Sequence, residues 1–463
     1  MATITHAGDP PAGALSLAGV LVLALGALDF GLEQSIVVPA LPALGDHYDA
    51  SLVAVGWLVT GFLLASVVAV PVLGRLGDIY GKRRLLLISL GTFALGALIC
   101  ALTESIALAI TGRVVQGIGA AVGPLSYGLA RDTVAPAQVS RAIGTVVGTA
   151  TAGGAIGFVL SGLLVDHVSA SAIFWFLFVL PIATGAAIIA LVPESPLRER
   201  VPLDLAGACL LALGLLAALL GISKGNDWGW SSARVVGLFT ISVVVLAGFV
   251  LVERRVRQPL VDLRLVTTQP FADANLCACL FGYSFFLAVV LVPLIAAAPK
   301  DTGYGLGLET TEIGLLLLPT GVASALGGWL AGQWVDRLGS RALVALGSAL
   351  AVAAYVSLAL AHDTWLALAS GSAVVGLTWG FLLTAIYMVT IRGVSTDKTA
   401  VAISVNVVGR NTAATLGVQI AFVIISGAGA AVESGFDRVF FMGAVGAGLT
   451  LLAARLLPGP APH

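Results

Sequence analysis

Long apolar segments alternate with short polar or Gly/Pro-rich breaks along the whole chain. A helix that crosses a bilayer needs about 20 apolar residues, and fourteen segments meet or approach that length. We expect spans near residues 16–39, 52–73, 85–103, 106–129, 142–165, 172–192, 204–222, 235–252, 272–297, 313–333, 342–361, 365–389, 400–425 and 438–457. Breaks fall at clusters such as Gly45–Ser51, Pro193–Pro202 and Lys300–Thr311. The pattern predicts an all-α polytopic membrane protein with fourteen transmembrane helices.

Two of the breaks carry nearly the same residues. Gly74–Arg83 reads GRLGDIYGKR and Gly332–Arg341 reads GQWVDRLGSR. Both contain Gly, three residues, Asp, two residues, Gly, one residue and Arg, and Asp78 lies 258 positions before Asp336. A polar hairpin that recurs once per half predicts two related six-helix bundles, with a substrate site near the midplane between them.

The repeat also predicts the domain organisation. We expect an N-terminal six-helix bundle over residues 1–193 and a C-terminal six-helix bundle over 269–463. Between them, residues 194–268 form a two-helix insertion with its cytoplasmic connectors.

Composition excludes a folded aqueous domain. Only 10% of the residues are charged and 59% are hydrophobic, whereas a soluble domain carries about 25% charged residues. The four Cys fall in predicted apolar helix, and the five His map to loops and tails, so a metal site is not expected. The chain has no Gly-Lys-[Ser/Thr] phosphate loop and no nucleophile–base set. We therefore expect neither an enzyme, nor a direct user of ATP, nor a nucleic-acid-binding protein.

The basic residues predict the orientation. With the N-terminus in the cytoplasm, seventeen of the 23 Lys and Arg fall on the cytoplasmic side and four outside. A signal peptide is not expected at the first span, because no Lys or Arg precedes it and it carries two acids. We expect a multi-pass protein of the cell membrane with both termini in the cytoplasm.

Four charged residues lie deep inside predicted spans. Asp29 and Glu33 are four apart and so share one face of the first helix, about 6 Å apart along its axis. Burial favours the neutral form of a carboxyl group, so such a group can bind and release protons near neutrality. Arg113 and Arg410 are the only deep basic residues, and each needs an acidic, polar or aqueous partner. One site that takes either a proton or a cationic substrate is the simplest interpretation; structural acids and a static ion pair are the alternative.

Several stretches carry a family resemblance. The repeated hairpin resembles the motif between helices 2 and 3 of the major facilitator superfamily, and fourteen spans point to its drug:proton antiporter branch. Ala27–Pro42 resembles that branch's first-helix motif, and Arg113–Ala121 resembles its fourth-helix motif. Its fifth-helix antiporter motif is resembled by Gly144, Gly153, Gly157 and Gly162, which we expect to let helices approach closely. Phe158 stands where that motif has Pro, which predicts a straighter helix.

The resemblance implies functions for these residues. It implies a secondary transporter that exports amphipathic or cationic small molecules in exchange for protons by alternating access. The proton gradient then supplies the energy, and no cofactor is expected. Asp29 and Arg113 are implied to couple protons, and the hairpins to gate the cytoplasmic side. The gate residues are Gly74, Asp78, Gly81 and Arg83, with Asp336 and Gly339 in the second copy. Gly74 and Gly81 permit close helix contact and a tight turn, and Asp78 is expected to cap a helix start or to pair with a nearby Arg such as Arg83. A basic loop that only anchors topology is the alternative for the hairpin.

Other polar and aromatic residues in the spans are candidates for the cavity wall, with simple packing as the alternative. They are Gln34, Trp57, Gln116, Tyr127, Tyr283, Trp379, Tyr387, Asn406, Arg410 and Asn411. The expected partners are a small-molecule substrate, protons and the lipid bilayer, with one chain as the functional unit. Alternative functions are export of one specific metabolite, siderophore or lipid, and proton-coupled uptake.

Overall fold

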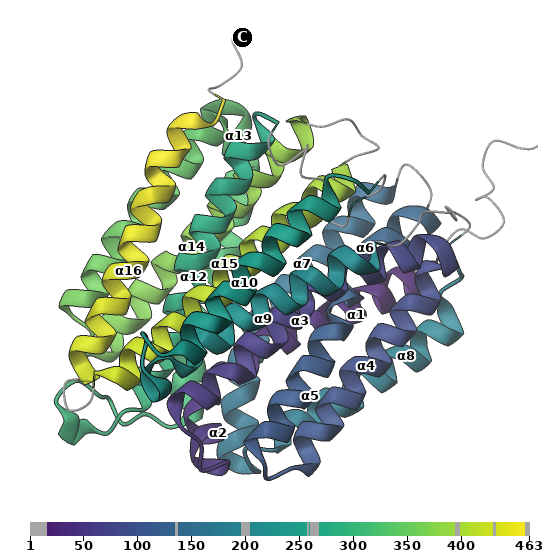
Figure 1. Ribbon diagram of the computed structural model, residues 1–463. Coiled ribbons are helices and arrows are strands. Elements are labelled where there is room, and N and C mark those ends of the chain that lie inside the picture. Colours follow the sequence, from purple (N-terminus) through teal and green to yellow (C-terminus); the bar gives the residue numbers. More distant parts are fainter. Residues whose placement is uncertain are drawn as a thin grey trace, which may run out of the picture.

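A computed structural model describes residues 16–134, 138–195, 204–256, 259, 268–393, 399–428 and 432–458. The regular secondary structure in these ranges is all helical, with no strand (Figure 1). The first helices are α1 Leu17–Ser35, α2 Leu41–His47, α3 Leu52–Tyr80, α4 Lys82–Leu102, α5 Ile106–Ile118, η1 Gly119–Ala121, α6 Val122–Thr133, α7 Val139–His167 and α8 Ala172–Leu191. The next two are α9 Leu205–Trp228 and α10 Ala233–Glu253. The remaining helices are α12 Phe271–Ala297, η3 Lys300–Thr302, α13 Thr310–Leu360, α14 Trp365–Gly393, α15 Thr399–Gly427, α16 Val432–Ala453 and η6 Ala454–Leu456.

The described helices account for the expected membrane spans. Thirteen helical segments in the described ranges are long and apolar enough to cross a bilayer. One of them, α13, has 51 residues and a non-helical backbone at Gly339. As one straight helix it would be about 75 Å long at 1.5 Å per residue, far more than the ~30 Å hydrocarbon core. Helix α13 therefore supplies two spans, and the prediction of an all-α protein with fourteen spans is confirmed.

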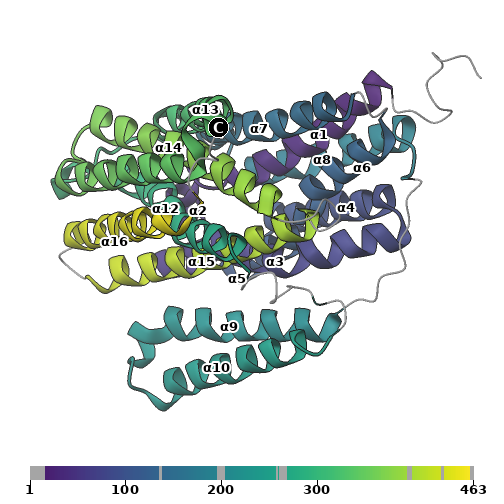
Figure 2. The same ribbon diagram turned by 90° about the horizontal axis from the view of Figure 1, so that it is seen from above.

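The two halves of the chain lie side by side. In Figure 2 the helices from α1 to α8 (purple to blue) lie beside those from α12 to α16 (green to yellow), and α9 and α10 lie as a pair alongside both groups. Trp57 of α3 donates a hydrogen bond to Ser223 of α9 at 3.1 Å. The amide of Asn226 on α9 donates to the Val423 carbonyl of α15 at 2.9 Å. The inserted pair thus contacts both halves, while the boundaries at residues 193 and 268 stay a prediction.

The halves pack closely at one end, called here the closed end, where α2 also lies (Figure 1). A Cβ on Gly162 of α7 would lie 2.2 Å from the Cα of Thr311 on α13, and one on Gly314 would lie 2.3 Å from the Phe158 carbonyl. The carboxylate of Asp166 on α7 also accepts the backbone N–H groups of Thr310 and Thr311. Only glycine at 162 and 314 permits this approach of the two backbones.

The opposite end is called here the hairpin end, because α3 turns into α4 there and α13 is interrupted at Gly339. Toward this end, a Cβ on Gly144 or Gly148 of α7 would meet no atom of the described residues within 4 Å. The same is true of Gly74 on α3 and Gly332 on α13. The two halves therefore separate toward the hairpin end.

Candidate functional site

The two hairpins share their backbone geometry as well as their sequence. Gly81 has φ 111° and Gly339 has φ 78°, a region that L side chains rarely adopt. The carboxylate of Glu194, just after α8, accepts the backbone N–H groups of Arg83 and Arg84 at 2.8 and 3.3 Å. A Cβ on Gly81 would lie 2.7 Å from that carboxylate. Glycine at position 81 thus permits both the turn and the cap on the N-terminus of α4.

Charged residues of the first hairpin bond within their own half. Lys82 lies 3.4 Å from Asp78 and 2.5 Å from Asp132 at the end of α6. The Arg83 guanidinium donates to the Ile189 carbonyl of α8 at 2.6 Å. The expected pairing of Asp78 with Arg83 is therefore wrong for this conformation, because the guanidinium points to α8 and Lys82 takes its place.

The charged residue of the second hairpin also pairs within its own half. Asp336 accepts from Arg392 of α14 at 2.5 Å, with both side chains exposed. The close helix contact expected at Gly74 is absent in this conformation, since the space beside it is open. The printed contacts of Asp78 and Asp336 thus stay within each half, and the gate between halves stays a prediction.

A buried polar cluster joins α1 to α5. Glu33 accepts from the Arg113 guanidinium and, at 3.1 Å, from the Gln116 amide. Arg113 also donates to the Gln116 side chain at 2.9 Å and to the Leu58 carbonyl of α3 at 2.8 Å, and its guanidinium lies 4.6 Å from the centroid of the Phe62 ring. Arg113 and Gln116 are three apart and so project from the same face of α5.

Asp29 lies one turn before Glu33 and is equally buried, with 2% exposure for each. Among the residues that the structure describes, neither carboxyl oxygen of Asp29 has a hydrogen-bond partner of normal geometry. The side chain of Thr184 on α8 lies close enough to interact with it. Asp29 and Glu33 thus differ in surroundings: one carboxyl group is paired with a cation and the other is not.

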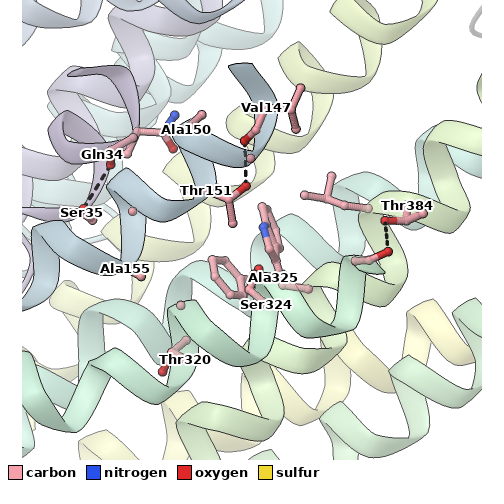
Figure 3. A pocket seen from close by; sticks show the side chains of 18 of the residues that line it. Gln34, Ser35, Val147, Ala150, Thr151, Ala155, Thr320, Ser324, Ala325 and Thr384 are labelled. Carbon is pink, nitrogen blue, oxygen red and sulfur yellow. Dashed lines mark hydrogen bonds between the residues drawn. The ribbon is translucent and has the colours of Figure 1, made fainter. Parts of the chain in front are cut away.

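A cavity of about 620 Å³ lies between the two halves, bounded by α1, α7, α12, α13 and α14. Figure 3 shows Gln34 and Ser35 of α1 with Thr151 of α7 on one side, and Thr320 and Thr384 on the other. Its aromatic lining residues are Phe30, Phe158, Phe285, Phe286, Trp329, Trp379 and Tyr387. The residues that line it are all uncharged.

Helix α1 separates the deep acids from this cavity. Phe30, Gly31 and Gln34 line the cavity, whereas Asp29 and Glu33 do not. Successive helix residues are rotated by about 100°, so α1 turns one face to the cavity and another to α5 and α8. The interpretation of one site shared by proton and substrate is therefore wrong for this conformation, because the acids point into the N-terminal bundle.

Three of the expected cavity residues, Gln34, Trp379 and Tyr387, line the cavity. Arg410 lies directly behind two of them: its guanidinium donates to the Tyr387 hydroxyl at 3.2 Å and lies 5.2 Å from the Trp379 ring centroid. Tyr127 of α6 is half-buried and is not among the residues that line the cavity.

The remaining cavity candidates do not line it. Trp57 faces α9 through its bond to Ser223, and Gln116 belongs to the Glu33 cluster. Tyr283 lines a second pocket, beside α16. The amide atoms of Asn406 are buried without partners, and Asn411 accepts a bond from Thr415 through its carbonyl.

The glycines of α7 mostly permit close packing. A Cβ on Gly153 would lie 2.7 Å from the Leu28 carbonyl, and one on Gly157 would lie 2.0 Å from Ser35 Oγ, both on α1. Gly162 packs on α13 as described above, whereas Gly144 lines the cavity and packs on nothing within 4 Å. The packing function expected of Gly144 is therefore wrong here. Helix α7 runs through Phe158 without a break.

Sequence reasoning missed several residues that the fold brings into use. Glu194 caps α4, Asp132 pairs with Lys82, and Asp166 joins the halves at the closed end. Each acid lies at a helix end, where a charged residue is unremarkable in sequence. Among the described residues, no group of three or more His, Cys, Asp or Glu is arranged to hold a metal ion.

A model of the Major Facilitator Superfamily matches residues 23–418. The chain belongs to that superfamily. It is 31% identical over 367 residues to the tetracenomycin C resistance and export protein of Streptomyces glaucescens, covering 76% of this chain and 66% of that protein. It is 27% identical over 455 residues to the "Probable actinorhodin transporter" of Streptomyces coelicolor, covering 94% and 77%. An uncharacterized transporter of the superfamily from Mycobacterium tuberculosis is 32% identical over 321 residues, covering 67% and 44%.

The chain spans less than two thirds of the first and the third of these relatives. Solved structures of the superfamily's fold are also similar. The human organic anion transporter MFSD10 has a TM-score of 0.63 at 18% identity, and the nucleoside transporter NupG has a TM-score of 0.67 at 11% identity. Each alignment covers 95% of this chain and 99% of the other. At these identities the likeness shows the fold, which is that of a membrane transporter.

Proposed function

We propose that this protein exports amphipathic small molecules in exchange for protons, by alternating access of the central cavity. One observation carries the proposal: helix α1 holds buried carboxyl groups on one face and lines the cavity with another face. A movement of α1 that follows protonation would change the cavity wall directly.

The cavity suits an amphipathic substrate. Its volume of about 620 Å³ falls within the roughly 300–1,000 Å³ of small-molecule sites. Its walls combine aromatic rings with a few hydroxyl and amide groups such as Ser324, Thr384 and Gln34. The cationic substrates that the family resemblance implies would meet no carboxylate on these walls. The cavity wall therefore supports an amphipathic substrate better than a cationic one.

The deep acids suit proton binding. A buried carboxylate without a cationic partner is costly, so Asp29, which has no such partner among the described residues, fits this structure as a neutral acid. Glu33 fits as a carboxylate, because it accepts from both Arg113 and Gln116. Loss of the Asp29 proton would place a second negative charge one turn from Glu33. The two carboxylates would then compete for the positive charge of the Arg113 guanidinium. We infer that this competition makes α1 slide against α7. The sliding surface is the close helix contact at Gly31 of α1 and at Gly153 and Gly157 of α7.

Alternating access needs an opening at each end in turn. The closed end is held by Asp166 and the glycine contacts of α7 with α13, while the hairpin end is separated. We infer that the hairpin end faces the cytoplasm of the cell, because most Lys and Arg lie on that side. In the opposite state the hairpins would come together and latch that end. One chain contains the complete pathway, so a monomer in the lipid bilayer is the proposed functional unit.

The names of the relatives support export of small molecules. They include a tetracenomycin C resistance and export protein, the actinorhodin transporter and Multidrug resistance protein 3 of Bacillus subtilis, which is 26% identical. A narrower exporter of one metabolite would use the same machinery, and the experiment below distinguishes the two.

The test compares efflux of ethidium and of tetracenomycin C from energised cells that express the wild type, Asp29→Asn, Glu33→Gln or the exposed control Asp227→Asn at equal levels. A protonophore should abolish wild-type efflux, and Asp29→Asn should reduce it to background, while Asp227→Asn should match the wild type. Purified Asp29→Asn should still bind the transported compound with wild-type affinity, because Asp29 does not line the cavity.

Two results would count against the proposal. Efflux that is unaffected by Asp29→Asn would remove the coupling assignment, and loss of substrate binding in Asp29→Asn would restore a shared site. Failure of a well-expressed wild type to export either compound would favour a dedicated metabolite exporter.

A further inference from the structure

The two deep arginines have different surroundings. Arg113 is paired with Glu33. Within the described part of the chain, Arg410 has no acidic side chain within 4.0 Å, and its Nε has no hydrogen-bond partner. A guanidinium keeps its charge in any protein environment. Arg410 therefore places an unneutralised positive charge in the interior of the C-terminal half.

This charge lies directly behind the cavity wall. The guanidinium of Arg410 lies 5.2 Å from the centroid of the Trp379 ring, and this ring stacks on the Phe285 ring at 3.9 Å. Trp379, Phe285 and Tyr387 all line the cavity. Among low-dielectric walls without a carboxylate, a cation at this depth produces a positive potential that attracts anions.

The fold holds the Arg410 side chain in place. A Cβ on Gly282 of α12 would lie 2.3 Å from Arg410 Cγ, so only glycine leaves room for the arginine stem. The half-buried side chain is then fixed at its tip by Tyr387 and Trp379. These contacts distinguish Arg410 from an arginine that faces lipid or lies in a loop.

The hydroxyl of Tyr387 connects Arg410 to the cavity through hydrogen bonds. Its hydroxyl oxygen accepts from Arg410 Nη1 at 3.2 Å, which leaves its own O–H to donate. A hydroxyl that accepts from a cation is a stronger donor, because hydrogen bonds in a chain polarise one another. The O–H of Tyr387 therefore suits a carboxylate or an acidic phenol held between the aromatic rings.

We propose that Arg410, Tyr387 and Trp379 form an anion-recognising subsite, so that the preferred substrates are aromatic molecules with an acidic group. This inference rests on the proposed function, because it assigns the chemistry of the molecule that the cavity takes.

The test uses three fluorescent probes with one ring system: anthracenecarboxylate, anthracenemethanol and aminomethylanthracene. Their Kd values are measured by fluorescence titration of the full chain in nanodiscs of phosphatidylcholine. The wild type should bind the carboxylate at least about tenfold more tightly than the amine, as expected of a hydrogen bond to a charged group. The ratio should fall to about one in Arg410→Gln and should be partly restored in Arg410→Lys.

Arg234→Gln is the matched control, since Arg234 is exposed and also stacks on a tryptophan, Trp228, at 5.5 Å. It should leave the ratio unchanged. Tyr387→Phe should weaken binding of the carboxylate and leave the amine unaffected.

Three outcomes would overturn the assignment. A carboxylate preference that survives in Arg410→Gln would place the anion site elsewhere. Equal binding of the charged probes by a wild type that binds the alcohol would remove this inference and leave the proposed function standing. If the wild type binds none of the three probes, the aromatic substrate cavity of the proposed function fails as well.

Discussion

The buried pair of Glu33 and Arg113 gives the sharpest stability prediction. In Arg113→Met, the Glu33 carboxylate keeps only its bond from Gln116 at 3.1 Å, and the Leu58 carbonyl loses its donor. Removing one member of a buried pair costs about 3–5 kcal/mol, so we expect a loss of about 4 kcal/mol in the free energy of unfolding. Glu33→Gln should cost less, about 3 kcal/mol, because Asp29 can release its proton and partly neutralise Arg113.

The double variant Glu33→Gln/Arg113→Met tests whether the two losses in the free energy of unfolding have the same cause. Additive effects would give a total of about 7 kcal/mol. We expect about 3 kcal/mol instead, because removing both charges leaves no uncompensated ion. What remains is roughly 1 kcal/mol for the lost bond to Leu58 and about 1–2 kcal/mol for the contact of Arg113 with Phe62, whose centroid lies 4.6 Å from the guanidinium.

The measurement is the free energy of unfolding of each purified variant, from SDS titration in mixed micelles followed by tryptophan fluorescence. The exposed pair Asp336 and Arg392, with 72% and 54% exposure, is the control. Breaking it should change the free energy by less than about 1 kcal/mol. Additive losses for Glu33→Gln and Arg113→Met would refute the reasoning, since they would mean that the two groups do not neutralise each other.

Three further predictions concern helix contacts. Asp166→Ala should favour opening of the closed end by about 1–2 kcal/mol, because two backbone N–H groups of α13 lose their acceptor; an unchanged distance distribution between spin labels on α7 and α13 would contradict it. Gly157→Ala should lower the Tm, since its Cβ would lie 2.0 Å from a side-chain oxygen of α1, whereas Gly91→Ala, with open space around it, should not. Equal Tm values for these two variants would count against the close packing of α1 and α7. Trp57→Phe removes the 3.1 Å bond to Ser223, worth about 1 kcal/mol, and should speed amide exchange in α9; unaltered exchange would show that this bond does not hold α9.

The helices and the repeat were predictable from local information. Runs of about 20 apolar residues must be helical in a membrane, because every backbone polar group needs an internal partner. The positions of Gly81 and Gly339 followed from the repeated hairpin, and both have the positive φ that only glycine adopts readily.

The pairing of Glu33 with Arg113 was only partly predictable. Two deep charges of opposite sign in one half require partners, but the sequence did not distinguish Asp29 from Glu33 as the member of the pair. Register between α1 and α5 decides this, and no local pattern specifies it.

The class, the spans, the repeated hairpins and the four charges inside the membrane could be predicted from the amino-acid sequence alone. The directions of the side chains required the folded structure: Asp29 and Glu33 face away from the cavity, Trp57 faces α9, and Arg410 lies behind Tyr387. This difference arises from the solvent around the helices. In water an amphipathic stripe marks the buried face of a helix, whereas lipid is as apolar as the core, so a membrane helix is apolar all round. Its rotation is then set by contacts with neighbouring helices, such as Gly157 against Ser35, which lie far apart in the chain.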